Sequence, residues 1–278
     1  MAEEVAVTVP VYRRAPDECD AAALRQCVSV LGGHPLILFM PESLDAAPWL
    51  ALSPKAAVKR FDDRFFASVA GYSSLMLSPF FYEHFTGFGY ILVHQLDAWV
   101  FRDELTDWCR RGYEYVGAPF FITDGRGRLP VVGNGGLSLR KVSAMKRVLS
   151  ETGGRMFPPE LLKLFFRNHW TSGNYAKAFF QLLRIVGSGN RRGKIVSRMR
   201  RDGDNEDMVL GYLNRRFVAD GLVTPDVREA AHFALDMESG YFFANGGGRM
   251  PFGIHGWNRP DRVEFLKERG IELRRQQA

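Results

Sequence analysis

The chain has 278 residues, enough for one large or two small domains with a substantial core. Hydrophobic residues make up 46% and charged residues 24% of the sequence, which is ordinary for a soluble globular protein. The net charge of +6 favours an anionic ligand or surface, although it does not name one.

Features of targeting and redox chemistry point to the cytoplasm. The three cysteines (Cys19, Cys27 and Cys109) are odd in number and lack CxxC spacing, which indicates reduced thiols and no disulfide framework or zinc site. The N-terminus opens with acids and lacks the basic region of a signal peptide. No apolar run approaches the roughly 20 residues of a membrane-spanning helix. We expect a cytoplasmic protein, at most peripheral to the inner face of a membrane.

Strands and helices alternate along the first half. The residue pattern predicts, in chain order, a strand at 5–12, a helix at 17–33, a buried strand at 34–42, a helix at 61–77, a loop through Pro79 and a strand at 90–97. It then predicts a helix at 103–112 capped by Asp103, strands in 113–121 and leading into 133–140, and helices from Lys141 and over 204–217. This alternation predicts a mainly parallel sheet covered by helices on both faces.

The segment YILVHQLDAWVF (90–101) places a carboxylate, Asp97, after a run of mostly apolar residues. A buried carboxylate is costly unless it is paired, hydrogen-bonded or bound to a metal, so its partner is either within the fold or a ligand. On a strand, Gln95 and Asp97 would share a face. The end of the strand is also where open α/β sheets bind ligands. Position alone favours neither alternative.

Three other motifs carry polar groups that could act on a ligand, and each also has a structural explanation. Gly133-Asn-Gly-Gly136 allows close backbone approach to a sugar, but a turn between two strands explains it as well. Asn205-Glu206-Asp207 could supply a general base or simply cap a helix. His255, in PFGIHGW, could bind a metal or a phosphate, or could be packed.

Several familiar motifs are missing. The first strand is not followed by GxGxxG, which argues against a dinucleotide fold of the dehydrogenase type. The absence of GxxxxGK[ST] excludes P-loop NTPases, and the absence of GxSxG removes the nucleophile elbow of α/β-hydrolases.

Taken in this order, QLDAWVF, YEYVGAPF, VGNGGLSLR, NED and PFGIHGW resemble the bacterial glycosyltransferase-like family DUF5672, whose members look like GT-A nucleotide-sugar transferases. The resemblance implies a GT-A-like single domain over 1–278, with a mixed, mainly parallel central sheet flanked by helices. It implies a nucleotide-binding half at about 1–140 and an acceptor-side half at about 141–260. A basic helical insertion is expected at about 161–201.

The resemblance also implies roles for individual residues. Gln95-Leu96-Asp97 matches the DxD motif of GT-A enzymes, with glutamine in place of the first acid. Asp97 and His255 would bind Mn²⁺ or Mg²⁺, and Asp207 would be the base of an inverting transfer with Glu206 as its supporting neighbour. The residues that would bind the donor, with UDP-linked sugars as the first expectation, are Val9, Pro10, Tyr12, Gln95, Asp97, Asn134, Gly135 and Gly136.

The segment RIVGSGNRRGKIVSRMRR (184–201) is strongly basic and contains no acid. It could be a solvated face, a loop that closes over the donor diphosphate, or a peripheral contact with an anionic membrane that carries a lipid-linked acceptor. Nucleic-acid binding ranks last because no recognisable RNA or DNA module is present.

Three functions therefore compete. The first is a metal-assisted glycosyltransferase that moves a sugar from a nucleotide-sugar donor to a glycan or lipid-linked acceptor. The second is a non-catalytic nucleotide-sugar or glycan-binding protein, which the replacement of an acid by Gln95 favours. The third is a basic nucleic-acid-binding protein.

Overall fold

We analysed a computed structural model of the chain, which describes residues 4–124, 127–150, 205–213 and 221–273. The predicted basic insertion at 161–201, including the segment 184–201, lies outside these residues. Among the described helices, none combines the length and the apolar character that a membrane crossing requires.

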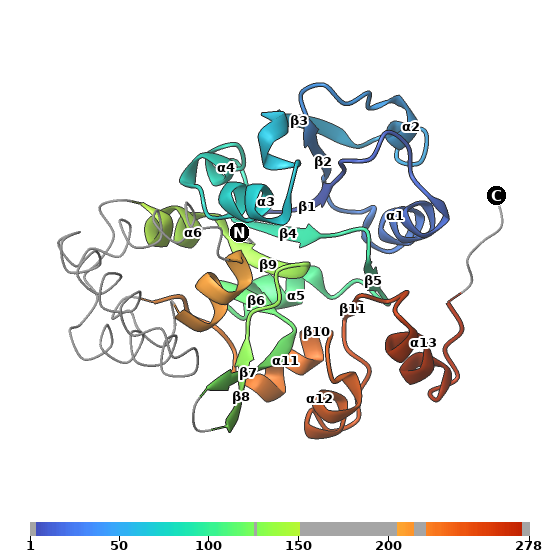
Figure 1. The fold of residues 1–278 in the computed structure, drawn as a ribbon, viewed down its shortest axis with the longest axis vertical. Coiled ribbons are helices and arrows are strands. Elements are labelled where there is room, and N and C mark those ends of the chain that lie inside the picture. The colour runs from blue at the N-terminus through green and yellow to red at the C-terminus, as the bar shows by residue number, and fades with distance from the viewer. Residues whose placement is uncertain (1–3, 125–126, 151–204, 214–220, 274–278) are drawn as a thin grey trace, which may run out of the picture.

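A six-stranded sheet forms the centre of the molecule, in the order β3-β2-β1-β4-β9-β6 (Figure 1). In chain order the strands are β1 (Val5–Pro10), β2 (Leu36–Pro41), β3 (Ala57–Phe61), β4 (Tyr90–His94), β6 (Tyr115–Gly117) and β9 (Leu137–Lys141). The strands β3, β2, β1 and β4 are parallel to one another, whereas β9 is antiparallel to both β4 and β6. The predicted mixed, mainly parallel sheet is confirmed.

Helices cover both faces of this sheet. Successive side chains of a strand point to opposite faces, and in the buried strands the side chains on both faces are apolar. In β1, the side chains of Val5, Val7 and Val9 pack into one core and that of Ala6 into the other. The first core also contains residues of α1 (Glu18–Leu31), α2 (Ala47–Leu50), α5 (Leu105–Arg110) and α11 (Val227–Phe233). The second contains residues of α3 (Val69–Met76), α4 (Pro79–Glu83) and α6 (Val142–Leu149).

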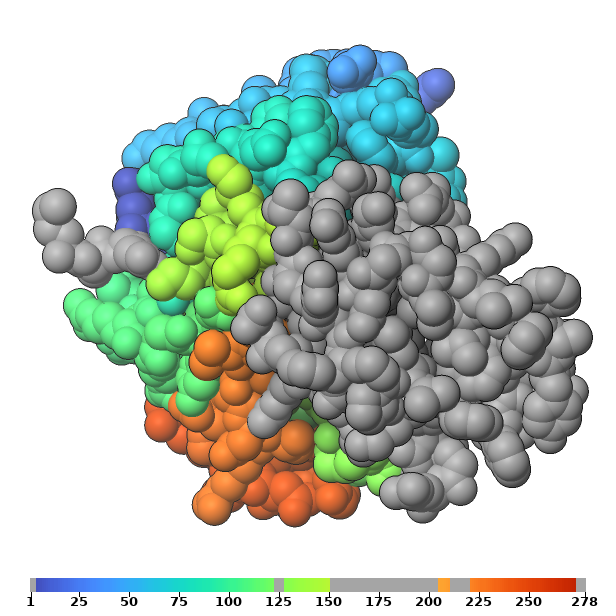
Figure 2. Space-filling view, turned by 90° about the vertical axis from the view of Figure 1, so that its left-hand side faces the viewer, coloured from blue at the N-terminus to red at the C-terminus, as the bar shows by residue number. Residues whose placement is uncertain are grey.

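A second, three-stranded sheet lies beyond the end of β4 and has the order β10-β11-β5. Its strands are β5 (Ala98–Val100), β10 (Ala234–Leu235) and β11 (Gly253–His255), and β11 pairs antiparallel to β5 with His255 opposite Ala98. The remaining described elements are the hairpin β7 (Pro119–Asp124) and β8 (Gly127–Val132), the short helices η1 (Asp63–Phe65) and η2 (Met208–Leu213), and the helices α12 (Ser239–Asn245) and α13 (Pro260–Lys267). In the space-filling view, α6 lies between the N-terminal elements, coloured blue to cyan, and the orange C-terminal part (Figure 2).

The helix predicted over 61–77 is wrong in its first half. The chain forms the edge strand β3, then η1, and only then α3, which begins after Ser68. The hydroxyl of Ser68 accepts the backbone N–H of Gly71 at 3.1 Å and so caps the helix. The strand escaped prediction because the adjacent charged residues Lys59 and Arg60 interrupt its short apolar pattern at the sheet edge, where charged side chains are common.

The segment at Pro79 is helical and not a loop, because proline at the first turn of a helix loses no hydrogen bond that the helix would make. The strand predicted over 90–97 ends at His94. Gln95 donates its N–H to Gly136 O at 2.8 Å, and Ala98 donates to Gln95 O at 2.9 Å. Gln95 and Asp97 therefore lie in a tight turn between β4 and β5, and not on one face of a strand as predicted.

Candidate functional site

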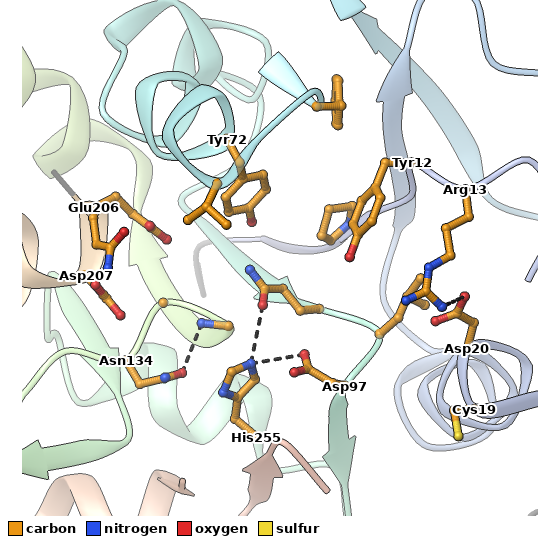
Figure 3. Close-up of a pocket in the computed structure, with 18 of the residues that line it drawn as sticks. Tyr12, Arg13, Cys19, Asp20, Tyr72, Asp97, Asn134, Glu206, Asp207 and His255 are labelled. Carbon is orange, nitrogen blue, oxygen red and sulfur yellow. Dashed lines mark hydrogen bonds and ion pairs between the residues drawn. The ribbon is translucent and has the colours of Figure 1, made fainter. Parts of the chain in front are cut away.

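A cavity of about 640 Å³ opens where β1 and β4 end (Figure 3). Its wall is formed by the segment from β1 into α1, the start of α3, the turn after β4, the loop before β9, residues 205–207 and the end of β11. Every predicted site residue except Val9 lines this cavity. The side chain of Val9 is fully buried in the core because it points into the sheet's apolar face, so that position can offer a ligand only its backbone.

The partner of Asp97 is His255. The Nε2 atom of His255 lies 3.0 Å from Asp97 Oδ1 and 3.3 Å from Gln95 Oε1. The pairing of β11 with β5 produces this contact, because His255 is opposite the residue that follows Asp97. A hydrogen bond of 3.0 Å from Trp257 N–H to Asp97 O continues the pairing past the end of the strand. The carboxylate and imidazole are therefore placed by backbone register.

His255 lies between two carboxylates, Asp97 on one side and Asp236 on the other. Its Nδ1 atom is 3.4 Å from Asp236 Oδ2. Burial lowers the pKa of His255, but the two carboxylates outweigh burial and raise that pKa to about 9. Burial likewise raises the pKa of Asp97, and His255 more than offsets it, so that the Asp97 carboxyl has a lowered pKa. With no cation bound, the group at neutral pH is thus an imidazolium flanked by two carboxylates, and a cation at Nε2 would have to replace the proton there.

The loop before β9 presents Asn134, Gly135 and Gly136 to the cavity. Asn134 Oδ1 accepts the N–H of Gly136 at 3.0 Å, which closes a turn inside the loop. Glycine is required at both Gly135 and Gly136, because other side chains pack closely against their Cα atoms. A Cβ atom on Gly136 would lie 2.0 Å from His255 Nε2, and one on Gly135 would lie 2.3 Å from Glu206 Oε1. The turn between β8 and β9 is therefore confirmed, whereas contact of this loop with a sugar stays a prediction.

Asp207 and Glu206 both line the cavity, but their surroundings differ. Glu206 accepts a hydrogen bond of 3.3 Å from the Ser73 hydroxyl and lies 3.4 Å from the guanidinium of Arg140, which is fully buried. Burial, and then the neighbouring charge of Glu206, raise the pKa of Asp207 to about 6. Asp207 also accepts the N–H of Met208 at 2.7 Å.

The end of the cavity next to β1 holds polar and aromatic groups. Tyr12 is 55% exposed and, with Tyr72 from α3, points its hydroxyl into the cavity (Figure 3). Arg13 lies beside them and donates a hydrogen bond of 2.9 Å to Asp20 in the first turn of α1. Sequence reasoning missed Arg13, Asp20 and Tyr72, because a basic residue after a strand, an acid in a helix and a helical tyrosine are each common without a ligand.

Asp236 is a further residue that sequence reasoning missed. It follows β10 directly, is 6% exposed, and accepts a hydrogen bond of 2.7 Å from Asn134 Nδ2. A signal was available: in PheAlaLeuAsp (233–236), as at Asp97, an acid comes directly after a short run of buried apolar residues. That run was too short to stand out as a strand.

A divalent cation fits three of these side chains. Among the described residues no group of three or more His, Cys, Asp or Glu side chains is arranged to hold a metal ion, so an amide would have to complete the set. Gln95 Oε1, Asp97 Oδ1 and His255 Nε2 supply that set, and Nε2 lies 3.3 and 3.0 Å from the two oxygens. Neighbouring ligands of an octahedral cation with bonds of about 2.1 Å are separated by about 3.0 Å. The carboxylate of Asp236 lies behind the imidazole, where ligand histidines usually have such a partner.

Comparison with solved structures finds glycosyltransferases with loose overlap. The core-mannan synthase CmsA/Ktr4 of Aspergillus fumigatus, in its Mn/GDP form, is 11% identical, with a TM-score of 0.41 over 74% of this chain and 71% of that one. The bifunctional glycosyltransferase WbbM is 9% identical, with a TM-score of 0.45 over 96% of this chain and 52% of that one. GlyE of Streptococcus pneumoniae TIGR4 is 12% identical, with a TM-score of 0.42 over 97% and 61%. At these scores the overlaps carry no argument about this protein, which spans little more than half the length of WbbM and GlyE.

No curated protein matches the sequence. One family model does, over residues 55–255, and it is described as "Protein of unknown function (DUF5672)". The match covers most of the chain and includes the turn with Asp97, the Asn134 loop, Asp207 and His255. The chain therefore belongs to the DUF5672 family.

Proposed function

We propose that the protein is a glycosyltransferase that uses a nucleotide-sugar donor, and the observation that supports this most is the composition of one cavity. A carboxylate, an imidazole and an amide converge at the end of β4. A glycine-rich loop with Asn134 borders them, and a carboxylate with a raised pKa, Asp207, lies in the same wall. A cavity of about 640 Å³ lies within the range typical of small-molecule sites.

Each part of the cavity has a task in this proposal. The nucleoside lies at the end bordered by Pro10 and Tyr12, and the donor sugar lies against Asn134, Gly135 and Gly136. Gln95, Asp97 and His255 hold Mn²⁺ or Mg²⁺ next to the diphosphate. The cation, when bound, neutralises charge that develops on the departing nucleoside diphosphate.

Asp207 is the general base in the proposed transfer. Its carboxylate takes the proton from the acceptor hydroxyl, whose oxygen forms a bond with the anomeric carbon of the donor sugar. The bond between that carbon and the diphosphate oxygen breaks, and its electron pair leaves with the nucleoside diphosphate. Direct attack inverts the anomeric configuration. Glu206 is held by Arg140 and Ser73 and raises the pKa of its neighbour.

The choice of UDP as the nucleotide, the glycan or lipid-linked acceptor, the cytoplasmic location and the division into halves at about residue 140 all remain predictions. A contact of segment 184–201 with a membrane falls outside the described residues.

The test is hydrolysis or transfer from a panel of nucleotide sugars, with Mn²⁺, with Mg²⁺ and with a chelator. We expect the wild type to release nucleoside diphosphate from one donor in the presence of a divalent cation. Asp97→Ala should abolish this release, whereas Asp107→Ala, which removes an exposed acid of α5, should leave it unchanged. Turnover that survives Asp97→Ala at the wild-type rate would contradict the proposal.

The alternative, a protein that binds a nucleotide sugar or glycan without turnover, is favoured by one observation. Gln95, a neutral side chain, occupies the place of an acid, so that within the described part of the chain Asp97 is the only carboxylate paired with His255 Nε2. Calorimetry with the same donors decides this case: binding that requires Asp97, together with the absence of product at any cation concentration, would establish it.

A further inference from the structure

Asp236 is a buried carboxylate that contacts two residues of the cavity without lining the cavity itself. Its Oδ2 atom accepts the hydrogen bond of 2.7 Å from Asn134 Nδ2 and lies 3.4 Å from His255 Nδ1. Its Oδ1 atom accepts a hydrogen bond of 2.7 Å from Arg262 Nη2 in α13. One side chain thus joins the loop of Asn134–Gly136 (the donor loop), the imidazole of His255 and the helix α13.

The groups around Asp236 all require an acceptor. Arg262 can only donate. Asn134 uses its own oxygen for Gly136 N–H, so the nitrogen of its amide must face Asp236. His255 turns Nε2 toward Asp97, and an Nε2 that is free to bind a cation requires the proton to be on Nδ1. A carboxylate, which has two oxygens and no proton, accepts hydrogen bonds from Asn134 and Arg262. It also places Oδ2 3.4 Å from His255 Nδ1, a buried atom that makes no hydrogen bond within the described residues.

The donor loop and the imidazole are also in direct contact. The space beside Gly136 Cα is filled by the His255 ring, whose Nε2 would be 2.0 Å from a Cβ atom there. A movement of the loop that Asn134 closes on Gly136 would therefore press on the His255 ring, and a movement of the ring would press on that loop. Asp236 is the group that contacts both from the side opposite the cavity.

We propose that Asp236 is a positioning residue that holds Asn134 and His255 in the arrangement in which they meet the donor and its cation. The proposal rests on the proposed function for the identity of that ligand. It adds a residue that touches neither donor nor cation and acts through two residues that do.

Asp236→Asn is the variant that tests this role, because it keeps the shape and removes one acceptor. Its remaining oxygen would face the buried charge of Arg262, and its NH₂ group would then meet the donors of Asn134 and His255. We expect Mn²⁺ affinity, measured by electron paramagnetic resonance, to fall about 10- to 100-fold. In metal-free protein, the Gly136 amide should exchange its hydrogen about tenfold faster, because its acceptor on Asn134 is no longer held.

Asp261→Asn is the matched control. Asp261 pairs with the same arginine, but its side chain is 62% exposed and does not line the cavity. This variant should leave both Mn²⁺ affinity and Gly136 exchange at wild-type values. If Asp261→Asn changed them as much as Asp236→Asn does, Asp236 would serve only to anchor Arg262, and the proposal would be wrong.

A double variant separates positioning from general loss of stability. In a His255→Ala background, Asp236→Asn should weaken Mn²⁺ binding little further, because the imidazole through which it acts is absent. If the losses of Mn²⁺ affinity in the two single variants simply added in the double variant, Asp236 would not act through His255. If the Gly136 amide exchanged its hydrogen at the wild-type rate in Asp236→Asn, Asp236 would not position Asn134.

Asp236→Glu provides a second variant if the asparagine variant does not fold. It keeps the charge opposite Arg262 but moves the oxygens by one methylene, so it should still weaken Mn²⁺ binding and speed Gly136 exchange. Wild-type values for both would contradict the proposal. If the wild type itself binds no Mn²⁺, the metal part of the proposed function fails, while exchange at Gly136 still decides whether Asp236 positions Asn134.

Discussion

Glu206 and Asp207 are adjacent acids whose surroundings give them different properties. Glu206 faces the buried guanidinium of Arg140 and the hydroxyl of Ser73. Asp207 makes no ion pair with a cation of the described residues, and burial and then the charge of Glu206 keep its pKa raised, to about 6. Neighbouring carboxylates with separated pKa values are a common basis for dividing catalytic roles. At the scale of single residues, the pH dependence of the reaction follows from this difference.

The rate should rise with pH through the pKa of Asp207. A general base acts in its deprotonated form, so kcat/KM should fall about tenfold for each pH unit below about 6 and level off above it. The measurement is a pH profile of kcat/KM between pH 4.5 and 8 with donor and cation fixed. A flat profile across pH 6 would show that the titration of Asp207 does not limit the reaction.

Asp207→Asn should lower kcat by about 10²- to 10⁴-fold, because the amide cannot accept the acceptor's proton. Donor binding, measured by calorimetry, should change by less than about threefold, since the side chain faces the acceptor in our proposal. Asp62→Asn, which changes an exposed acid in the turn before η1, is the control. Equal losses of donor affinity and of kcat would assign Asp207 to binding.

At the scale of elements, two tight connections bring the site residues together: the turn from β4 to β5 and the loop from β8 to β9. The second works because β9 runs antiparallel in a mainly parallel sheet, so it starts at the edge where β4 ends. Polar residues that interrupt apolar strands made both connections stand out in the sequence, but only the resemblance to the DUF5672 family assigned them to chemistry.

Gly136→Ala should disable the site without unfolding the sheet. The added methyl would lie 2.0 Å from His255 Nε2, and so the imidazole must move away from Asp97. We expect Mn²⁺ affinity to fall at least tenfold. Gly33→Ala, where an added methyl meets nothing within 4 Å, should bind Mn²⁺ as the wild type does. Unchanged affinity in Gly136→Ala would show that the imidazole takes no part in binding.

Arg140 should contribute strongly to stability because it is fully buried and pairs with Glu206 across the second core. Arg140→Met would leave that carboxylate buried and uncompensated, and the free energy of unfolding should fall by about 3–5 kcal/mol. Arg110→Met breaks an exposed pair and should cost at most about 1 kcal/mol. Urea unfolding of both variants measures the difference, and similar losses would argue against the buried pair as a stabilising contact.

The sequence predicted the elements whose structure is decided by the local pattern of side chains. It did not predict features that depend on contacts between residues far apart in the chain. Periodicity predicted β1, α1, β2 and β4, because buried strands and amphipathic helices carry their pattern locally. It missed β3, whose adjacent charges at Lys59 and Arg60 reflect its edge position, and it extended β4 past His94. Asp236 could not be predicted from spacing, because its role comes from meeting Asn134 and Arg262, which lie far away in the chain.

At the scale of the whole molecule, the site lies where the chain passes from one sheet to the other. Asp97 lies in the turn that joins β4 of the six-stranded sheet to β5 of the smaller one, and His255 ends the strand paired with β5. Residues from about position 10 to position 258 line the same cavity. A ligand bound there contacts both sheets and should stabilise the whole fold.

Nucleoside diphosphate with Mn²⁺ should therefore raise the thermal unfolding midpoint. At a ligand concentration 100 times its Kd, the gain is about 2.7 kcal/mol, which corresponds to roughly 5 °C or more for a chain of this size. Asp97→Ala should remove the shift. The measurement is scanning calorimetry with UDP, GDP and CDP, each with and without Mn²⁺, and an equal shift in Asp97→Ala would place the nucleotide elsewhere.

The pairing of β11 with β5 has a consequence for biosynthesis. The large sheet has all six of its strands once Lys141 has left the ribosome, whereas the imidazole that meets Asp97 is more than a hundred residues further on. Until that late strand arrives, β5 has no neighbour on the side where β11 belongs, and the carboxylate has no counter-charge from His255. A nascent chain can thus complete its main scaffold long before His255 can meet Asp97.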